Sequence, residues 1–139
     1  MNSAVTDIAD LRALPLFSRL DDEGLRRVAG LAVELEIPAG QVFVHAGDPG
    51  SGLFVVLTGT AVVETRGETM IEVGPGEFVG ELALLVPKAM RSARVRAKSD
   101  VRCLAIFGGD FQELLEDEPR IALAMLPVVA ERLWSTRAV

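Results

Sequence analysis

The hydrophobic positions along the chain change their spacing twice, from helical to alternating and back to helical. Apolar residues recur every three positions between Ile8 and Leu14, Pro15 ends that segment, and Asp21 can cap a second helix. This first part of the pattern predicts a small helical bundle over residues 1–31.

A long middle stretch alternates apolar and polar residues in short runs, which is the spacing of half-buried strands. The first run places Val33, Leu35 and Ile37 on one face of a strand. Further strand-like runs are separated by turn-forming glycine and proline residues and cover 41–45, 53–57, 60–65, 70–73, 93–98 and 101–107. Roughly eight short strands at this spacing are typical of an antiparallel barrel or jelly roll, which we predict for residues 32–107.

The last part of the chain, residues 108–139, returns to helical spacing. Asp110 and Glu113 are spaced as a capping pair for a first helix, and Pro119 can begin a second. Pro127 lies inside the second helix, where it removes a hydrogen bond and is expected to kink the axis. The whole pattern therefore predicts a mainly β domain with helices before and after it.

Composition narrows the classes of function. The 139 residues suffice for one domain with its own core, and the single cysteine, Cys103, cannot form a disulfide framework. A net charge of −6 without a basic patch argues against direct nucleic-acid binding. His45 has no companion ligands, so no metal is expected. No apolar run reaches the roughly 18 residues of a membrane span, and the N-terminus has no signal core, so we expect a cytoplasmic protein.

The strongest chemical signal is the segment from Phe78 to Leu85, followed after a spacer by Arg91. It joins a strand end, the glycine at Gly80, a predicted short helix whose first N–H groups can face an anion, and an arginine that can grip a phosphate. Glu81 would repel such a ligand unless it accepts hydrogen bonds from the ligand's own hydroxyl groups. The segment therefore predicts a site for a sugar that carries a free hydroxyl beside a phosphate.

These residues resemble the phosphate-binding cassette of the cyclic nucleotide-binding domain family, which includes catabolite activator proteins, the regulatory subunits of protein kinase A and cyclic-nucleotide-gated channels. The family pattern reads Phe-Gly-Glu-aliphatic-Ala-Leu and, after a spacer, Arg-Ser/Thr/Ala-Ala-x-Val, and this chain matches it with Val79 inserted. The resemblance implies a β-roll with the cassette at residues 78–95, N-terminal helices, and hinge and lid helices after the roll.

The resemblance also implies the ligand contacts. Glu81 would accept a hydrogen bond from the ribose 2′-hydroxyl, and Arg91 would pair with the cyclic phosphate. Gly80, the backbone of Leu82 and Ala83, and Ser92 would complete the cradle. Because threonine in place of Ser92 tends to accompany cGMP in the family, the resemblance favours cAMP over cGMP, with no further cofactor.

In the family, the helices after the roll move onto the bound purine, and Arg132, Leu133 and Trp134 occupy the position of such a lid here. Their position is the only support for this role. Trp134 is equally suited to anchor the core or a dimer, so the oligomeric state stays open and includes a dimer through the C-terminal helix.

The sequence thus predicts a non-enzymatic cyclic nucleotide sensor over residues 1–139. Binding would rearrange the C-terminal helices and signal to a separate effector protein, because the chain leaves no room for an output domain unless it is a piece of a longer product. The alternative is a ligand-free protein-interaction module with a vestigial nucleotide pocket. An enzyme on the same fold is disfavoured, because the chain pairs no nucleophile with a base and clusters no metal ligands.

Overall fold

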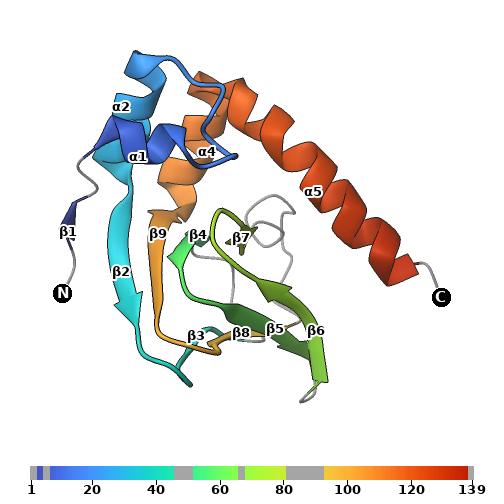
Figure 1. Cartoon of the computed structure of the whole chain (residues 1–139). Helices are drawn as coiled ribbons and strands as arrows, with labels where there is room; N and C mark the ends of the chain where they lie inside the picture. The colour runs from blue at the N-terminus through green and yellow to red at the C-terminus, as the bar shows by residue number, and fades with distance from the viewer. Residues whose placement is uncertain (1–2, 5–6, 46–51, 66–67, 81–92, 138–139) are drawn as a thin grey trace.

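Two antiparallel β-sheets form the centre of the computed structural model, which describes residues 3–4, 7–45, 52–65, 68–80 and 93–137. Within these residues, the first sheet has the order β1 (Ser3–Ala4), β2 (Val33–Ile37), β9 (Val101–Phe107), β4 (Gly52–Thr58) and β7 (Phe78–Val79). The second has the order β3 (Val42–Val44), β8 (Arg94–Ala97), β5 (Ala61–Thr65) and β6 (Glu68–Val73). Figure 1 shows them folded into a roll, which confirms the predicted β-roll architecture.

Helices cover one end and one side of the roll (Figure 1). α1 (Ile8–Arg12), α2 (Asp22–Leu31) and α4 (Gly108–Asp117) pack together, and α5 (Pro119–Arg137) extends alongside the strands. The predicted cap of α2 is confirmed, because the carboxylate of Asp21 accepts a hydrogen bond from the backbone N–H of Gly24 at 2.8 Å. Among the described helices, none combines the length and apolar character of a membrane-spanning segment.

The first sheet is buried on both faces, and this explains the unbroken apolar runs of its central strands. Leu53 and Val55 of β4 belong to a core shared with the helices, which also contains the fully buried Phe17. Phe54 and Val56, their neighbours in sequence, belong to a second core enclosed between the two sheets. Because successive side chains of a strand point to opposite faces, one strand supports both cores.

Two features differ from the sequence-based expectations or were absent from them. The predicted capping pair is wrong: α4 begins at Gly108 with Phe107 at its N-cap position and no side-chain cap, so Asp110 lies in the first turn instead. β1 pairs with β2, although two residues were too short a segment to show any period. The last helix forms as expected: α5 begins at Pro119 and continues through Pro127. The kink at Pro127 stays a prediction.

We expect Gly59→Ala to destabilise the protein more than Gly40→Ala. Both glycines have φ of +89°, which alone costs a residue with a side chain about 1 to 2 kcal/mol. A Cβ at Gly59 would lie 2.1 Å from the carbonyl oxygen of Asp100, whereas no atom lies within 4 Å of one at Gly40. Urea unfolding of both variants measures the difference, and equal losses of stability would contradict the predicted close contact.

Candidate functional site

A tight turn directly precedes β7, the strand at which the cassette begins. The backbone N–H of Glu77 donates to the carbonyl oxygen of Gly74 at 3.0 Å, with Pro75 and Gly76 between them, and Gly76 has φ of +87°. These features are those of a type II turn, in which glycine at the third position supplies the positive φ. The Glu77 carboxylate also accepts from the N–H of Gly74 at 2.8 Å, which closes the turn from its other side.

The strand after this turn, β7, ends at the glycine of the cassette motif. Phe78 and Val79 are buried and pair with β4, and Gly80 follows with φ of +95°. That conformation favours glycine, so the backbone requires this residue before Glu81. The other predicted contact residues, Glu81, Leu82, Ala83, Arg91 and Ser92, lie outside the described residues.

The chain returns to the roll at β8, which lies between β3 and β5 in the second sheet. Val95 and Ala97 are buried in the core between the sheets, whereas Arg94 and Arg96 lie on the opposite face, as the alternating pattern predicted. Val79 belongs to the same core as Val95. Both flanks of the cassette are therefore anchored in one buried cluster.

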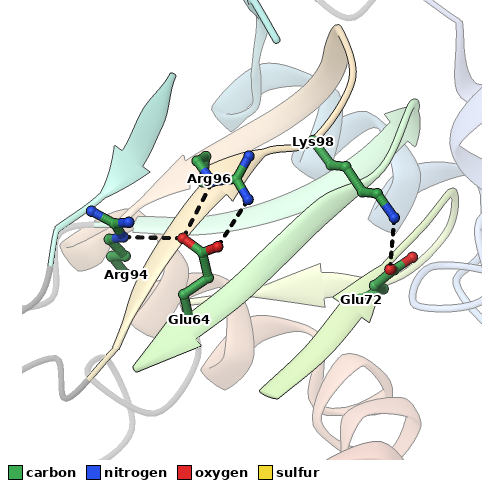
Figure 2. Close-up of polar contacts among 5 residues, drawn as sticks. All are labelled: Glu64, Glu72, Arg94, Arg96 and Lys98. Carbon is green, nitrogen blue, oxygen red and sulfur yellow. Dashed lines mark hydrogen bonds and ion pairs between the residues drawn. The ribbon is translucent and has the colours of Figure 1, made fainter. Parts of the chain in front are cut away.

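A buried carboxylate holds the start of β8. Glu64 on β5 is 6% exposed and stands directly opposite Arg94. Its Oε1 accepts hydrogen bonds from Arg94 Nε at 3.1 Å and Arg96 Nε at 3.2 Å, and its Oε2 accepts from Arg96 Nη2 at 2.8 Å. Figure 2 shows both guanidinium groups converging on this carboxylate. Three charged donors thus compensate the loss of water around Glu64.

The arginines also shift the protonation equilibrium of Glu64. Hydrogen bonds from Arg96 lower the pKa of this carboxyl group, burial opposes them, and the hydrogen bond from Arg94 lowers it further. The same contact raises the pKa of Arg96. Both groups are therefore held in their charged forms.

We expect Glu64→Gln to reduce stability near neutral pH and to matter less in acid. Because the folded-state pKa is lowered, these contacts stabilise the fold above the unfolded carboxyl pKa of about 4.3 and lose that effect as the pH falls through the folded value. Urea midpoints of both proteins, compared from about pH 7 down to about pH 3, measure this convergence.

The matched control is Glu72→Gln, which removes the partner of Lys98 on the same face (Figure 2). That pair is half exposed on both sides, so its loss should have little effect at any pH. A stability difference for Glu64→Gln that stays constant across the acid range would contradict the ionic explanation.

Arg132 joins α5 to the strand that precedes the cassette. Its Nη2 donates a hydrogen bond to the carbonyl oxygen of Phe78 at 2.6 Å, and its guanidinium carbon lies 4.8 Å from the centroid of the Phe78 ring. A cation above an aromatic face is attracted by the ring quadrupole. Arg132 thus contacts the roll two residues before Gly80 in the chain.

The other two residues predicted for the lid are exposed to solvent. Leu133 is 57% exposed and Trp134 is 73% exposed, so Trp134 is not an anchor of the core. Leu123 and Leu126 are also exposed, and α5 therefore presents several large apolar side chains to solvent. The lid and the dimer anchor remain as alternatives for Trp134.

A pocket of about 200 Å³ lies between α5 and the turn that leads to the cassette. It is lined by Pro15 and Leu16, by residues 75–77, by Phe78, and by Ala124 and Val128 of α5. Its walls are mostly apolar. α5 therefore packs against the roll without filling the space in front of β7.

Metal-binding clusters and the thiol of Cys103 can be assessed in the described residues. Across those parts of the chain, no three His, Cys, Asp or Glu side chains converge on a point that could hold a metal ion. Cys103 is buried between the sheets, and burial raises the pKa of its thiol to about 12. A thiol with so high a pKa is not a nucleophile at neutral pH.

The family model of the cyclic nucleotide-binding domain matches residues 34–118, which is more than half of the chain. A cyclic nucleotide-gated potassium channel of Mesorhizobium japonicum is 36% identical over 120 residues, covering 86% of this chain and 33% of the channel. An uncharacterized NTE family protein of Mycobacterium tuberculosis is 34% identical over 128 residues, covering 91% of this chain and 22% of that protein. The chain thus spans about a fifth to a third of these relatives.

The architecture is also that of a solved regulator. The crystal structure of the catabolite activator protein of Thermus thermophilus matches with a TM-score of 0.75 and 30% identity, covering 88% of this chain and 59% of that one. The matched family model spans both flanks of the cassette, from the glycine turn to β8. The chain therefore belongs to the cyclic nucleotide-binding domain family.

Proposed function

We propose that the chain is a sensor domain that binds cAMP, or less favourably cGMP, with Glu81 on the ribose 2′-hydroxyl and Arg91 on the cyclic phosphate. The observation that supports the proposal is the geometry of the two segments on either side of the cassette. Gly80 has the glycine-specific conformation at the start of the motif, and Val79 and Val95 anchor both ends in one core. The motif residues themselves come from the sequence.

Local rather than global charge must attract the ligand. The chain carries a net charge of −6, which repels an anionic nucleotide at long range. Salt screens that repulsion beyond about 8 to 10 Å, whereas hydrogen bonds from a guanidinium act at contact distance. Arg91 and the backbone N–H groups after Gly80 are the proposed donors.

The response to the ligand would come from α5. Arg132 already joins this helix to β7, and the pocket beside it leaves space into which the helix can move. A ligand that binds the closed position more tightly would shift the equilibrium by its difference in affinity. The signal would then pass to a separate effector, or to an attached region in a longer protein.

An interaction module without a ligand is the second candidate. The observation that favours it is the apolar surface of α5, where Leu123, Leu126, Leu133 and Trp134 are all more than half exposed. Exposed apolar patches of this kind are typical of protein contacts. The two functions differ in whether a cyclic nucleotide binds at all.

We expect Arg91→Ala to weaken cAMP binding by about 2 to 4 kcal/mol, because the phosphate would keep its desolvation cost without its partner. Calorimetry on protein that has been unfolded and refolded to remove carried-over nucleotide measures the affinity, with cAMP and cGMP titrated separately. Arg26→Ala is the matched control, since Arg26 is exposed on α2 and should leave binding unchanged.

The outcomes separate the two candidates. Saturable binding that Arg91→Ala abolishes supports the sensor and identifies its purine. Binding that is unaffected by Arg91→Ala would remove the proposed pocket. Absence of heat and of thermal stabilisation with either nucleotide would favour the interaction module.

Trp134 reports directly on the end of α5, because it is the only tryptophan of the chain and is 73% exposed. For a lid, saturating cAMP should move its fluorescence to shorter wavelength and protect it from acrylamide, since the indole leaves water. For a dimer anchor, the same changes should follow protein concentration without ligand, together with the sedimentation coefficient.

The Arg91→Ala protein with the same concentration of cAMP is the control for direct quenching by the nucleotide. Binding detected by calorimetry with unchanged emission would exclude Trp134 from the lid. Unchanged emission across protein concentrations would exclude it from a dimer interface.

A further inference from the structure

A single residue joins the last two helices. α4 ends at Asp117 and α5 begins at Pro119, so Glu118 alone lies between them. Pro119 disfavours a helical conformation of the residue before it, and Glu118 is non-helical, with φ of −130° and ψ of 72°. The N–H of Glu118 donates to the carbonyl oxygen of Leu114 at 2.7 Å, and its carbonyl oxygen accepts from the N–H of Ile121 at 3.0 Å. The backbone of Glu118 therefore sets the angle between α4 and α5.

The side chain of Glu118 is tied to the N-terminal helices. Its Oε2 accepts a hydrogen bond from Nη1 of Arg27 on α2 at 2.5 Å. The Glu118 side chain is only 15% exposed and lies against Gly24 of the same helix, where an added Cβ would come within 2.6 Å of Oε1. The absence of a side chain at Gly24 therefore gives this carboxylate its place on α2.

α5 is held near both of its ends. In its first turn, Arg120 Nη1 donates to the carbonyl oxygen of Arg19, in the segment before α2, at 3.0 Å. Near its far end, Arg132 contacts Phe78. α5 has 19 residues and is about 28 Å long, so a change of angle at its start moves its far end most (Figure 1). The contacts at the junction therefore bear on where the whole helix lies.

We propose that Glu118 and Arg27 form an ionic latch by which α2 fixes the angle between α4 and α5. An event that breaks this pair at α2 frees the junction and changes the position of α5 without any event at the cassette. The inference goes beyond the proposed function, because it concerns how α5 is held in the protein alone and requires no nucleotide. Arg27 is 43% exposed, so the pair is accessible enough to be released.

An ordinary surface ion pair is the alternative, and Arg27 itself provides the comparison. Its Nη2 also donates to Glu23, four residues earlier on α2, at 3.3 Å, and the Glu23 side chain is 75% exposed. Exposed pairs within one helix contribute little to stability. Glu23→Gln therefore removes a carboxylate from the same arginine without releasing the junction, and it is the matched control.

The test measures the position of α5 in the full chain, without ligand, by pulsed electron paramagnetic resonance. Nitroxide labels are attached to Gly30→Cys on α2, where no atom lies within 4 Å of an added Cβ, and to Glu131→Cys, an exposed position on α5. The protein without introduced cysteines is the blank for the buried Cys103.

Glu118→Gln and Arg27→Gln should each broaden the distribution of distances between the labels and shift its mean. The double variant should broaden it no further, because both substitutions remove the same pair. Glu23→Gln should leave the distribution unchanged. If Glu118→Gln does not fold, Arg27→Gln, at an exposed position, gives the same reading.

Amide hydrogen exchange separates a loosened junction from a general loss of stability. The N–H groups of Glu118 and Ile121 form the hydrogen bonds of the junction, and both should exchange roughly tenfold faster in the two latch variants. The N–H of the buried Val56, which donates to the carbonyl oxygen of Glu77 at 2.8 Å, should keep its protection.

An unchanged distance distribution in Glu118→Gln or in Arg27→Gln would overturn the latch. A matching change in Glu23→Gln, or additive effects in the double variant, would overturn it as well. Exchange at Val56 that accelerates as much as at Glu118 would assign the effect to general destabilisation and would also exclude the latch. None of these outcomes depends on whether cAMP binds, so the latch and the proposed function can fail separately.

Discussion

The ladder between β4 and β9 is the constraint on which the rest of the structure depends, because it lies in a sheet buried on both faces. Alternate residues of β4 supply the core under the helices and the core inside the roll. A shift in register by one residue would turn each set of side chains to the opposite face of the sheet, away from the residues that pack against it. β7 pairs with β4, so the entry to the cassette takes its position from the most buried part of the protein.

The two flanks of the cassette are held by different means. At the entry, Gly76 and Gly80 adopt positive φ and turn the backbone where a side chain would be strained. At the exit, the buried carboxylate of Glu64 holds two arginines of β8. Backbone conformation thus holds the strand before the cassette, and ion pairing holds the strand after it.

The alternating pattern was sufficient to predict most of the strands, because burial of one face dictates the period of a strand that is long enough to show it. It could not predict which strands pair. Glu64 and Arg94 are 30 residues apart, and Arg132 and Phe78 are 54 apart, so both contacts appear only after the sheets are assembled. The predicted cap at Asp110 is wrong because β9 ends at Phe107 and α4 begins at the next residue, Gly108. The cassette motif was recognised from its residues, and the roles of Glu81 and Arg91 stay predictions.

The contact between Arg132 and Phe78 sets what a ligand would have to overcome. Under the proposed function, if α5 kept this contact while moving, the helix would pivot about a point two residues before Gly80. If α5 breaks it, the loss of a charged hydrogen bond costs about 1.5 to 3 kcal/mol, together with the cation–π attraction. A ligand can shift the equilibrium only by its difference in affinity for the two positions. Under the proposed function, this contact would therefore help to determine how strongly binding and helix position are coupled.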